Sequence, residues 1–309
     1  MTTALITHPA CLGHEPPAGH PERPARLREV LKALETSEFG GLLRKPAPKA
    51  SHEALARAHS EEFVDSMLRA IPESGFARLD SDTIASPGTG DAALHAAGAV
   101  VLAIDMVMAN EVKNAFCAVR PPGHHATQNQ AMGFCLFNNV AVGALHARAV
   151  HGLRRIAVVD FDVHHGNGTQ AIFESDAELF YGSTHQSPLY PGTGRIDETG
   201  VAHNIFNVPL PPGAAGAQFR RAFETVLLPA LDQFQPELLI ISAGFDAHRD
   251  DPLAQLRLDE SDFGWATEML CASAERMCRG RVVSALEGGY DLEATARSAS
   301  AHVRALMAA

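Results

Sequence analysis

The stretch VVDFDVHHGNGTQ, residues 158–170, decides how this chain folds and where its chemistry lies. It begins as the apolar run of a buried strand and then places Asp160, Asp162 and His164 at every second position. Because residues i, i+2 and i+4 of a strand project to one face, the pattern predicts two carboxylates and an imidazole side by side. Such charges are very costly on a buried strand unless a bound cation compensates them. The stretch therefore predicts a strand with a metal site on one face.

A metal site of this composition suits zinc or a similar divalent cation, with one coordination position left open for water. A further ligand has to come from another segment, and Asp246, directly after the apolar run LLIISAGF, is the best candidate. Carboxylates also bind magnesium and manganese, so the pattern alone does not fix the metal. The alternative reading, that these side chains are N-caps and turn residues at a sheet edge, is weakened by the polar residues that end three other predicted strands.

Apolar segments alternate with helical patterns along the 309 residues. Apolar residues at helical spacing predict helices at 92–108, 137–150, 217–234 and 262–277. Short apolar strands between such helices indicate a parallel sheet that is covered on both faces. The predicted strands are 114–119, 155–163, 178–183, 237–246 and 281–290.

Four predicted strands end in loops rich in glycine and polar residues: RPPGHH, HHGNGT, SAGFDAHRDD and EGGYD. In open parallel sheets, ligands bind outside the carboxyl ends of the strands. The four loops should therefore meet at one edge of the sheet, although they are far apart in sequence. Splitting the chain would break up this site, so we expect one domain over residues 1–309.

The composition excludes several classes of function. A net charge of −11 argues against a non-specific grip on nucleic acid phosphates, although it would attract a basic substrate. Five scattered cysteines without a CxxC pair indicate reduced thiols in a cytoplasm. The first residues lack the basic start and apolar run of a signal peptide, and no stretch approaches the ~18 uncharged apolar residues of a membrane span. We expect a cytoplasmic protein that binds neither nucleic acid nor membrane.

The loops also carry candidates for acid–base chemistry. His124 and His125 lie in GHHA, after an RPPG segment that makes the loop rigid. Beside a metal, one imidazole can act as general base and the other as an electrostatic partner. Tyr290 in EGGY offers a phenol donor to a developing oxyanion, although packing under a loop is an equal alternative. A metal-activated water, a base and an oxyanion donor describe the hydrolysis of an amide or ester carbonyl.

Six motifs resemble, in order, the signature blocks of the zinc-dependent histone deacetylase and acetylpolyamine amidohydrolase superfamily. They are RPPGHHA, MGFCLFNN, VVDFDVHHGNGTQ, YPGTG, SAGFDAHRDDPL and LEGGYDL, and the similarity extends from GHPERPARL near residue 20 to Tyr290. The asparagine in HHGNGT resembles the class II and bacterial branch. The resemblance implies the arginase-deacetylase α/β fold, with about eight strands and the active site at their carboxyl ends.

The resemblance also implies two cations. Zinc would bind Asp162, His164 and Asp246. A structural potassium ion would lie beneath it, held in part through backbone carbonyls. The residues at the matching potassium positions are Asp160, Asp162, His164, Ser183 and Thr184.

In the same resemblance, Asp160 is not a zinc ligand but hydrogen-bonds to His124 and favours its imidazolium form. Asn167 takes the corresponding position beside His125. A neutral amide raises the basicity of that imidazole less than a carboxylate would, which suits a base near neutral pH. We therefore predict His125 as general base and then acid, His124 as electrostatic stabiliser, and Tyr290 as the matching catalytic tyrosine.

The resemblance places the substrate in a narrow apolar tunnel. Phe134 and Tyr190 would form its walls, and the Gly133 carbonyl would accept the substrate amide N–H; core packing remains an alternative for Tyr190. Leu253 lies where a polyamine-specific relative has glutamate, which favours acyl-lysine or another neutral-ended chain. Asp82 would bind the substrate backbone at the rim, unless it is a solvated loop carboxylate.

The leading hypothesis is a zinc-dependent deacylase acting on an acylated lysine peptide or protein, or on a similar acylated amine. An acetylpolyamine amidohydrolase is the first alternative, and a non-catalytic acyl-lysine binding module is the second. Arg23 corresponds loosely to an internal-channel arginine of the family. A homo-oligomer is compatible with the sequence.

Overall fold

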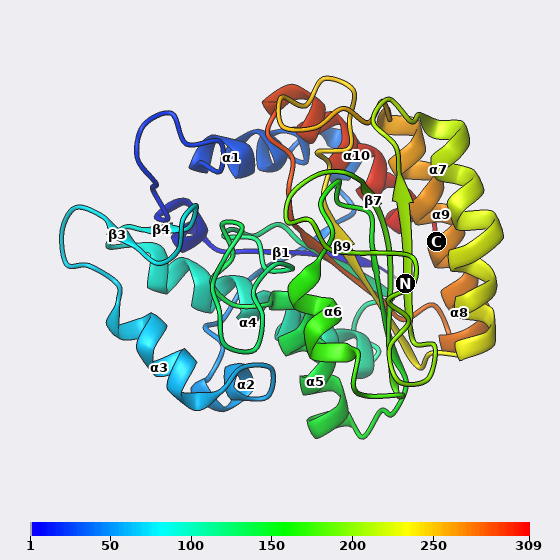
Figure 1. Ribbon diagram of the computed structural model, residues 1–309, viewed down its shortest axis with the longest axis horizontal. Helices are drawn as coiled ribbons and strands as arrows, with labels where there is room; N and C mark the ends of the chain where they lie inside the picture. The colour runs from blue at the N-terminus through cyan, green and yellow to red at the C-terminus, as the bar shows by residue number, and fades with distance from the viewer. Residues whose placement is uncertain (1) are drawn as a thin grey trace.

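The structure is a computed structural model that describes residues 2–309. Two short strands, β3 (Ala77–Arg78) and β4 (Ile84–Ala85), form a small antiparallel sheet of their own. The strands of the main sheet are β1 (Thr3–Thr7), β2 (Leu43–Pro46), β5 (Asn114–Cys117), β6 (Ile156–Asp160), β7 (Leu179–Gln186), β8 (Ile205–Leu210), β9 (Leu238–Ala243) and β10 (Val282–Leu286). They form one sheet in the order β2-β1-β5-β10-β9-β6-β7-β8 (Figure 1). Every neighbouring pair is parallel. The predicted parallel sheet of about eight strands is confirmed.

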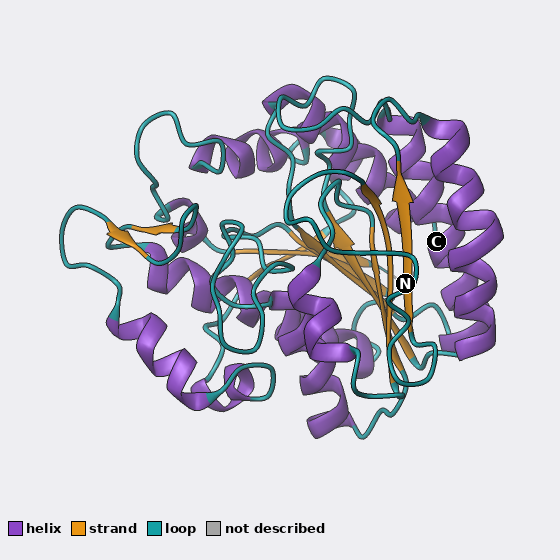
Figure 2. Ribbon diagram, in the orientation of Figure 1, coloured by secondary structure: helices purple, strands orange, loops and turns teal. Residues whose placement is uncertain are grey.

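Helices cover both faces of this sheet (Figure 2). They are α1 (Pro24–Ala33), α2 (His52–Ala56), α3 (Glu61–Arg69), α4 (Thr89–Met108), α5 (Asn139–His151), α6 (Asn167–Phe173), α7 (Gly216–Ala222), α8 (Leu228–Phe234), α9 (Glu260–Cys278) and α10 (Leu292–Ala308). Helices α4, α5 and α6 pack on one face, and α1, α9 and α10 pack on the other. A π-helical segment, Phe223–Leu227, joins α7 and α8 just before Pro229, which has no N–H for an intrahelical bond.

The five predicted strands match β5, β6, β7, β9 and β10, which lie inside the sheet. Every residue of these five strands is buried, because both faces of the strands are covered. Strands β6 and β9 are apolar almost throughout, whereas β7 (LFYGSTHQ) becomes polar toward its carboxyl end. Strands β1, β2 and β8 were not predicted. The two edge strands β2 and β8 have the sequences LRKP and IFNVPL, whose charged residues and prolines are typical of sheet edges. Strand β1 is only a short apolar segment, TALIT, near the start of the chain.

Helix α4 has the length and apolar character of a membrane span, so the expectation that no segment approaches one was too strong. However, 67% of its most apolar window is buried inside the protein. It contacts β5, β10 and α5. A helix that is apolar all round and packed on several sides is a core helix of the fold.

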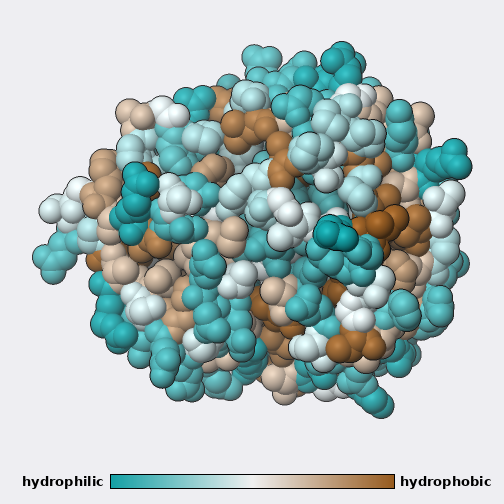
Figure 3. All heavy atoms as spheres, in the orientation of Figure 1, coloured by the Kyte–Doolittle hydropathy of each residue, from teal (hydrophilic) through white to brown (hydrophobic). Residues whose placement is uncertain are grey.

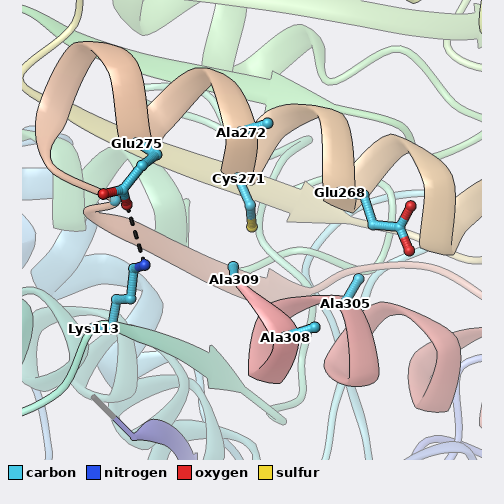
Figure 4. A pocket seen from close by; sticks show the side chains of 9 residues that line it. Lys113, Glu268, Cys271, Ala272, Glu275, Ala305, Ala308 and Ala309 are labelled. Carbon is cyan, nitrogen blue, oxygen red and sulfur yellow. Dashed lines mark ion pairs between the residues drawn. The ribbon is translucent and has the colours of Figure 1, made fainter.

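A hollow of about 340 Å³ lies at the amino ends of β5 and β10, between α9 and α10 (Figure 4). Lys113 and Glu275 point toward each other across it, with Nζ and Oε2 3.1 Å apart. Its other lining side chains are mostly small and apolar, such as Ala305 and Ala308. It lies opposite the carboxyl ends of the strands, where the candidate catalytic residues are found.

His302 on α10 is buried between the sheet and α9. Thr267 donates its hydroxyl to the carbonyl of Phe263 and accepts a hydrogen bond from Nδ1–H of His302 at 2.6 Å. The hydroxyl of Ser284 on β10 therefore donates to Nε2 at 2.8 Å. Burial lowers the pKa of His302 to about 3, so this ring stays neutral in the folded protein near neutral pH.

The pKa of His302 makes stability depend on pH. The unfolded chain takes up a proton at this histidine below about pH 6.5, whereas the folded chain resists it down to about pH 3. The free energy of unfolding should therefore fall as the pH falls from 6.5 toward 3, by up to about 1.4 kcal/mol per pH unit from this group. Urea unfolding of the wild type and His302→Asn at pH 7.5 and 5.5 measures the contribution. The variant should lose about 1.4 kcal/mol less than the wild type between these pH values; equal losses would contradict this assignment.

Candidate active site

The loops that follow β5, β6, β9 and β10 carry the candidate residues. In the sheet these strands are neighbours, in the order β5-β10-β9-β6. All four run in the same direction, so their carboxyl ends lie at one edge. The structure thereby brings together segments that are separated by more than a hundred residues, which is the arrangement that binds ligands in open parallel sheets.

Asp162, His164 and Asp246 form a buried group of metal-ligand type. Nδ1 of His164 is 3.0 Å from Oδ1 of Asp162 and 3.2 Å from Oδ2 of Asp246. The hydrogen bond of Nδ1 of His164 goes to Oδ1 of Asp162, so Oδ2 of Asp246 is one of the buried side-chain oxygens without a hydrogen-bond partner among residues 2–309. A buried, unpaired carboxylate oxygen is costly unless a cation satisfies it. One imidazole and two carboxylates around such an oxygen fit a divalent cation of the zinc type.

Two glycines let the backbone approach these carboxylates. A Cβ atom on Gly244 would lie 2.0 Å from Oδ2 of Asp162, and one on Gly288 would lie 2.0 Å from Oδ2 of Asp246. The N–H of Gly288 also donates to Oδ2 of Asp162 at 2.8 Å. A side chain at either position would fill the space around the two carboxylates. The glycines of the SAGF and EGGY segments therefore shape the site.

The argument that placed Asp160, Asp162 and His164 on one strand face was wrong. Strand β6 ends at Asp160, and the two residues after it in the pattern lie in a loop. The N–H of Asp162 donates to Oδ1 of Asp160 at 3.0 Å, and the N–H of His164 donates to Oδ1 of Asp162 at 2.9 Å. An aspartate side chain often accepts a hydrogen bond from the backbone N–H two residues later. Two such turns in succession, rather than a strand, position the side chains of Asp162 and His164.

His124 and His125 differ in their hydrogen-bond partners. Nδ1 of His124 is 2.9 Å from Oδ2 of Asp160, whereas Nδ1–H of His125 donates to Oδ1 of Asn167 at 2.8 Å. Burial opposes the charge on His124, but Asp162 and Asp160 outweigh it and raise the pKa of His124 to about 10. Burial and the neighbouring His124 lower the pKa of His125 well below its usual range. The pKa values of the two imidazoles are therefore shifted in opposite directions, and the Nδ1–H tautomer of His125 leaves its Nε2 without a hydrogen.

The ring of Tyr290 is held from two sides. The guanidinium of Arg26 lies 4.7 Å from its centroid, and the ring of Phe134 meets it edge-on at 5.9 Å. Arg26 is fully buried and donates to the carbonyl oxygens of Gly289 and Glu287. Arg26 is thus a buried arginine of this segment.

The expectation for Arg23 was wrong, because this residue is exposed at the N-cap of α1. Arg26 lies three residues further on the same helix, on the face that turns toward the sheet edge, and it was not named from the sequence. Helical periodicity in PERPARL could show that Arg26 lies on the inner face of α1, but not which loop it contacts.

One hollow of about 220 Å³ opens at this edge of the sheet. Tyr190 is one of the large side chains exposed on the surface, at 39% exposure, and it lines this hollow. On the face drawn in Figure 3, hydrophilic side chains are interspersed with several separate apolar patches. All five predicted substrate-binding residues line the hollow, and Leu189 was not anticipated. The lining residues are Asp82, His125, Gly133, Phe134, His164, Leu189, Tyr190, Leu253 and Tyr290.

Gly133 and Phe134 both have left-handed backbone conformations, with φ of 57° and 68°. A Cβ atom on Gly133 would lie 2.4 Å from the ring of His125, so this position requires glycine. Oδ1 of Asp82 accepts the N–H of Gly133 at 2.9 Å, and the hydroxyl of Thr83 accepts the N–H of Phe134 at 3.1 Å. Asp82 therefore lies at the rim, where one of its oxygens binds the protein's own backbone.

Ser183 and Thr184 are buried on β7, next to β6. Ser183 lies opposite Asp160 in the register of the two strands. The hydroxyl of Ser183 hydrogen-bonds to Nδ1 of His185 at 2.9 Å. The backbone carbonyl of Ser183 is therefore the group that is left for binding a cation. Oγ1 of Thr184 is buried without a hydrogen-bond partner.

A second group of potential metal ligands, Asp105, His146 and His151, lies on α4 and α5. Nε2 of each histidine is 2.7 Å from Oδ1 of Asp105, which is the length of a hydrogen bond. Arg57 donates to Nδ1 of His146 at 3.1 Å, so Nε2 of this ring carries the proton. That nitrogen has no free lone pair for a cation, and the group is satisfied as a hydrogen-bond network.

Comparisons with known proteins place the chain in a family. Residues 20–306 match the model described as histone deacetylase domain. The histone deacetylase-like amidohydrolase of Pseudomonas aeruginosa is 41% identical over 89% of this chain and 74% of its own length. A probable deacetylase of Archaeoglobus fulgidus is 38% identical over 95% of this chain and 82% of its own length.

A solved structure supports the same assignment. The crystal structure of the HDA15 HD domain superposes with a TM-score of 0.94 at 38% identity, covering 99% of this chain and 88% of that one. The fold predicted from the motifs is therefore confirmed over nearly the whole chain, and the family model indicates a hydrolase. The chain belongs to the histone deacetylase family.

Proposed function

We propose that this chain is a zinc-dependent deacylase that hydrolyses the amide of an acylated lysine side chain in a peptide or protein. The observation that carries the proposal is one hollow lined by His125, His164 and Tyr290 together. A neutral imidazole, a residue of the metal-ligand group and a phenol then face the same space. We extend the proposal to residues 1–309 as one deacetylase domain.

In this proposal Asp162, His164 and Asp246 hold zinc, as their donor atoms and the unpaired Asp246 oxygen suggest. A divalent cation at this position acidifies a water molecule and polarises the acyl carbonyl. A structural potassium ion is proposed beneath it, which fits the buried position of the residues concerned. They are Asp160, Asp162, His164, Ser183 and Thr184.

Each remaining residue has a defined part. His125 accepts a proton from the attacking water at Nε2 and later gives it to the leaving amine nitrogen. Asn167 keeps the Nδ1–H tautomer that leaves Nε2 free. His124, paired with Asp160, stays positive and stabilises the negative charge that develops. Tyr290 donates its hydroxyl to the oxyanion.

The hollow also suggests the class of substrate. Phe134 and Tyr190 form apolar walls for the lysine methylenes, and the Gly133 carbonyl is the proposed acceptor for the substrate amide N–H. Leu253 adds no charge that would select a polyamine. Asp82 is proposed to contact the substrate backbone with the carboxylate oxygen that does not bind Gly133.

The proposed location is the cytoplasm. Cys11, Cys117, Cys135, Cys271 and Cys278 are all unpaired and buried in the structure. Unpaired thiols in a chain of this size suit a reducing compartment.

The substrate proposal is tested by comparing kcat/KM on an acetyl-lysine peptide and on N-acetylputrescine. We expect the peptide to be the better substrate. The reverse preference would assign the same chemistry to acetylpolyamines. No turnover of either compound by protein with bound zinc would contradict a deacetylase and favour the acyl-lysine binding module.

Leu253→Glu should change the substrate preference. A carboxylate at this wall of the hollow attracts a cationic amine and is poorly solvated beside a neutral chain. The ratio of kcat/KM for acetylputrescine over the peptide should rise about tenfold, equivalent to ~1.4 kcal/mol. Leu253→Met conserves volume and should leave the ratio near the wild-type value. A ratio that is the same in both variants would remove Leu253 from the selectivity determinants.

A further inference from the structure

Asp251 is a buried carboxylate that the proposed reaction does not use. It is 6% exposed and lies in the loop after β9, five residues beyond Asp246. Its Oδ2 accepts the N–H of Tyr290 at 2.7 Å and the N–H of Asp291 at 3.3 Å. Its Oδ1 accepts the N–H of Leu253 at 3.0 Å. One carboxylate thus joins the loop that carries Leu253 to the turn that carries Tyr290.

Capping of helix α10 does not explain this contact. Asp291 is itself the N-cap of α10, and its side chain accepts the N–H of Ala294 at 2.8 Å. The orphan N–H groups of the first turn therefore have a cap of their own. Asp251 instead binds the peptide N–H of Tyr290, just before the helix.

The same peptide group, between Gly289 and Tyr290, is also held at its other end. Its carbonyl oxygen, on Gly289, accepts a hydrogen bond from Arg26, and its N–H, on Tyr290, donates to Asp251. Gly289 has φ of 124°, a conformation that side chains rarely adopt, so the turn depends on these outside contacts to define its position.

We propose that Asp251 is a positioning residue that holds the backbone of Tyr290 and the backbone of Leu253 as one unit. It fixes the position of the Tyr290 hydroxyl relative to Leu253, the wall residue that is proposed to select the substrate. The inference rests on the proposed function, because it acts through the roles of Tyr290 and Leu253. It assigns no contact between Asp251 and the substrate.

Asp251→Asn is the sharpest substitution. The amide keeps the shape but has one acceptor oxygen and one donor nitrogen, so an N–H group would face an N–H group on one of the two loops. One loop is then released, and kcat should fall about tenfold, since displacements of about 1 Å can reduce rates by 10². Asp250→Asn is the matched control, because Asp250 is the adjacent aspartate, its side chain is 51% exposed, and it undergoes the same carboxylate-to-amide substitution.

A double-mutant cycle with Tyr290→Phe separates positioning from a general loss of structure. If Asp251 acts through the phenol, Asp251→Asn lowers kcat about tenfold in the wild type but changes it little in Tyr290→Phe, which has already lost the donor. Equal losses in both backgrounds, with equal zinc content, would overturn the proposal. Asp250→Asn should leave kcat near the wild-type value in both.

Hydrogen exchange tests the same inference without any turnover. In Asp251→Asn, exchange should accelerate at the amides of Tyr290, Asp291 or Leu253, while the strands keep wild-type protection. Unchanged protection of all three amides would overturn the proposal. Absence of turnover in the wild type would refute the proposed function, whereas the exchange data would still decide whether Asp251 holds the two loops.

Discussion

Replacing Tyr290 by phenylalanine is expected to lower kcat about 10²–10³-fold, the usual loss when one oxyanion donor is removed. The substitution removes only the hydroxyl. The ring should keep its position, because Arg26 and Phe134 contact its face and edge rather than its oxygen. KM for the acetyl-lysine peptide and the zinc content should therefore stay near their wild-type values. Steady-state kinetics and metal analysis by mass spectrometry measure all three.

Tyr190→Phe provides the comparison for Tyr290→Phe. It removes a hydroxyl from the same hollow, but at the half-exposed wall rather than next to the metal-ligand group. Its effect should be confined to KM and amount to a few-fold change, because Tyr190 contributes to binding rather than to the oxyanion. If the two variants lower kcat equally, Tyr290 is not the oxyanion donor.

Asp246→Ala is expected to abolish zinc binding and turnover together. Its loss removes one of three donors, and the remaining aspartate and histidine cannot fill a protein site of the catalytic zinc type. Asp246 also braces the loop, because its Oδ1 accepts the N–H of Val163 at 2.8 Å. Asp246→Asn keeps an acceptor for this N–H but loses the charge, so it distinguishes the loss of the hydrogen bond to Val163 from the loss of the metal ligand. Both variants should lack stoichiometric zinc.

Asp105→Ala is the matched control for the metal prediction. It removes the carboxylate of the other histidine–aspartate group, which is satisfied by hydrogen bonds. This variant should retain about one zinc ion per chain and wild-type turnover. Full zinc occupancy in Asp246→Ala, or loss of zinc in Asp105→Ala, would show that the ligand set has been assigned to the wrong group.

The central strands could be predicted from the sequence for a physical reason. Strands that are buried on both faces favour apolar residues, and the sequences of β6 (IAVVD), β9 (LLIISA) and the first half of β7 (LFYG) show this most clearly. Edge strands such as β2 need no such run, so LRKP carries no strand signal. The exact end of β6 was also not predictable, because Asp160 and Asp162 stop the strand by bonding to the backbone that follows them.

The site was predictable where its residues lie in motifs that the resemblance covers. Asp160 and Asn167 were paired with His124 and His125 in this way, although the partners lie in two different motifs. Arg26 and Asp251 were not identified, because each acts on the backbone around Tyr290, more than 30 residues away in sequence. Such contacts appear only once the sheet has brought its loops together.

The most direct test of the account is the zinc dependence of turnover in one preparation of the wild-type protein. Zinc is removed with a chelator, hydrolysis of an acetyl-lysine peptide is measured, and zinc is then titrated back. The account predicts no turnover without metal and full recovery at about one zinc ion per chain, with Asp246→Asn unresponsive to the titration. Hydrolysis that continues at the full rate in metal-free protein would contradict it.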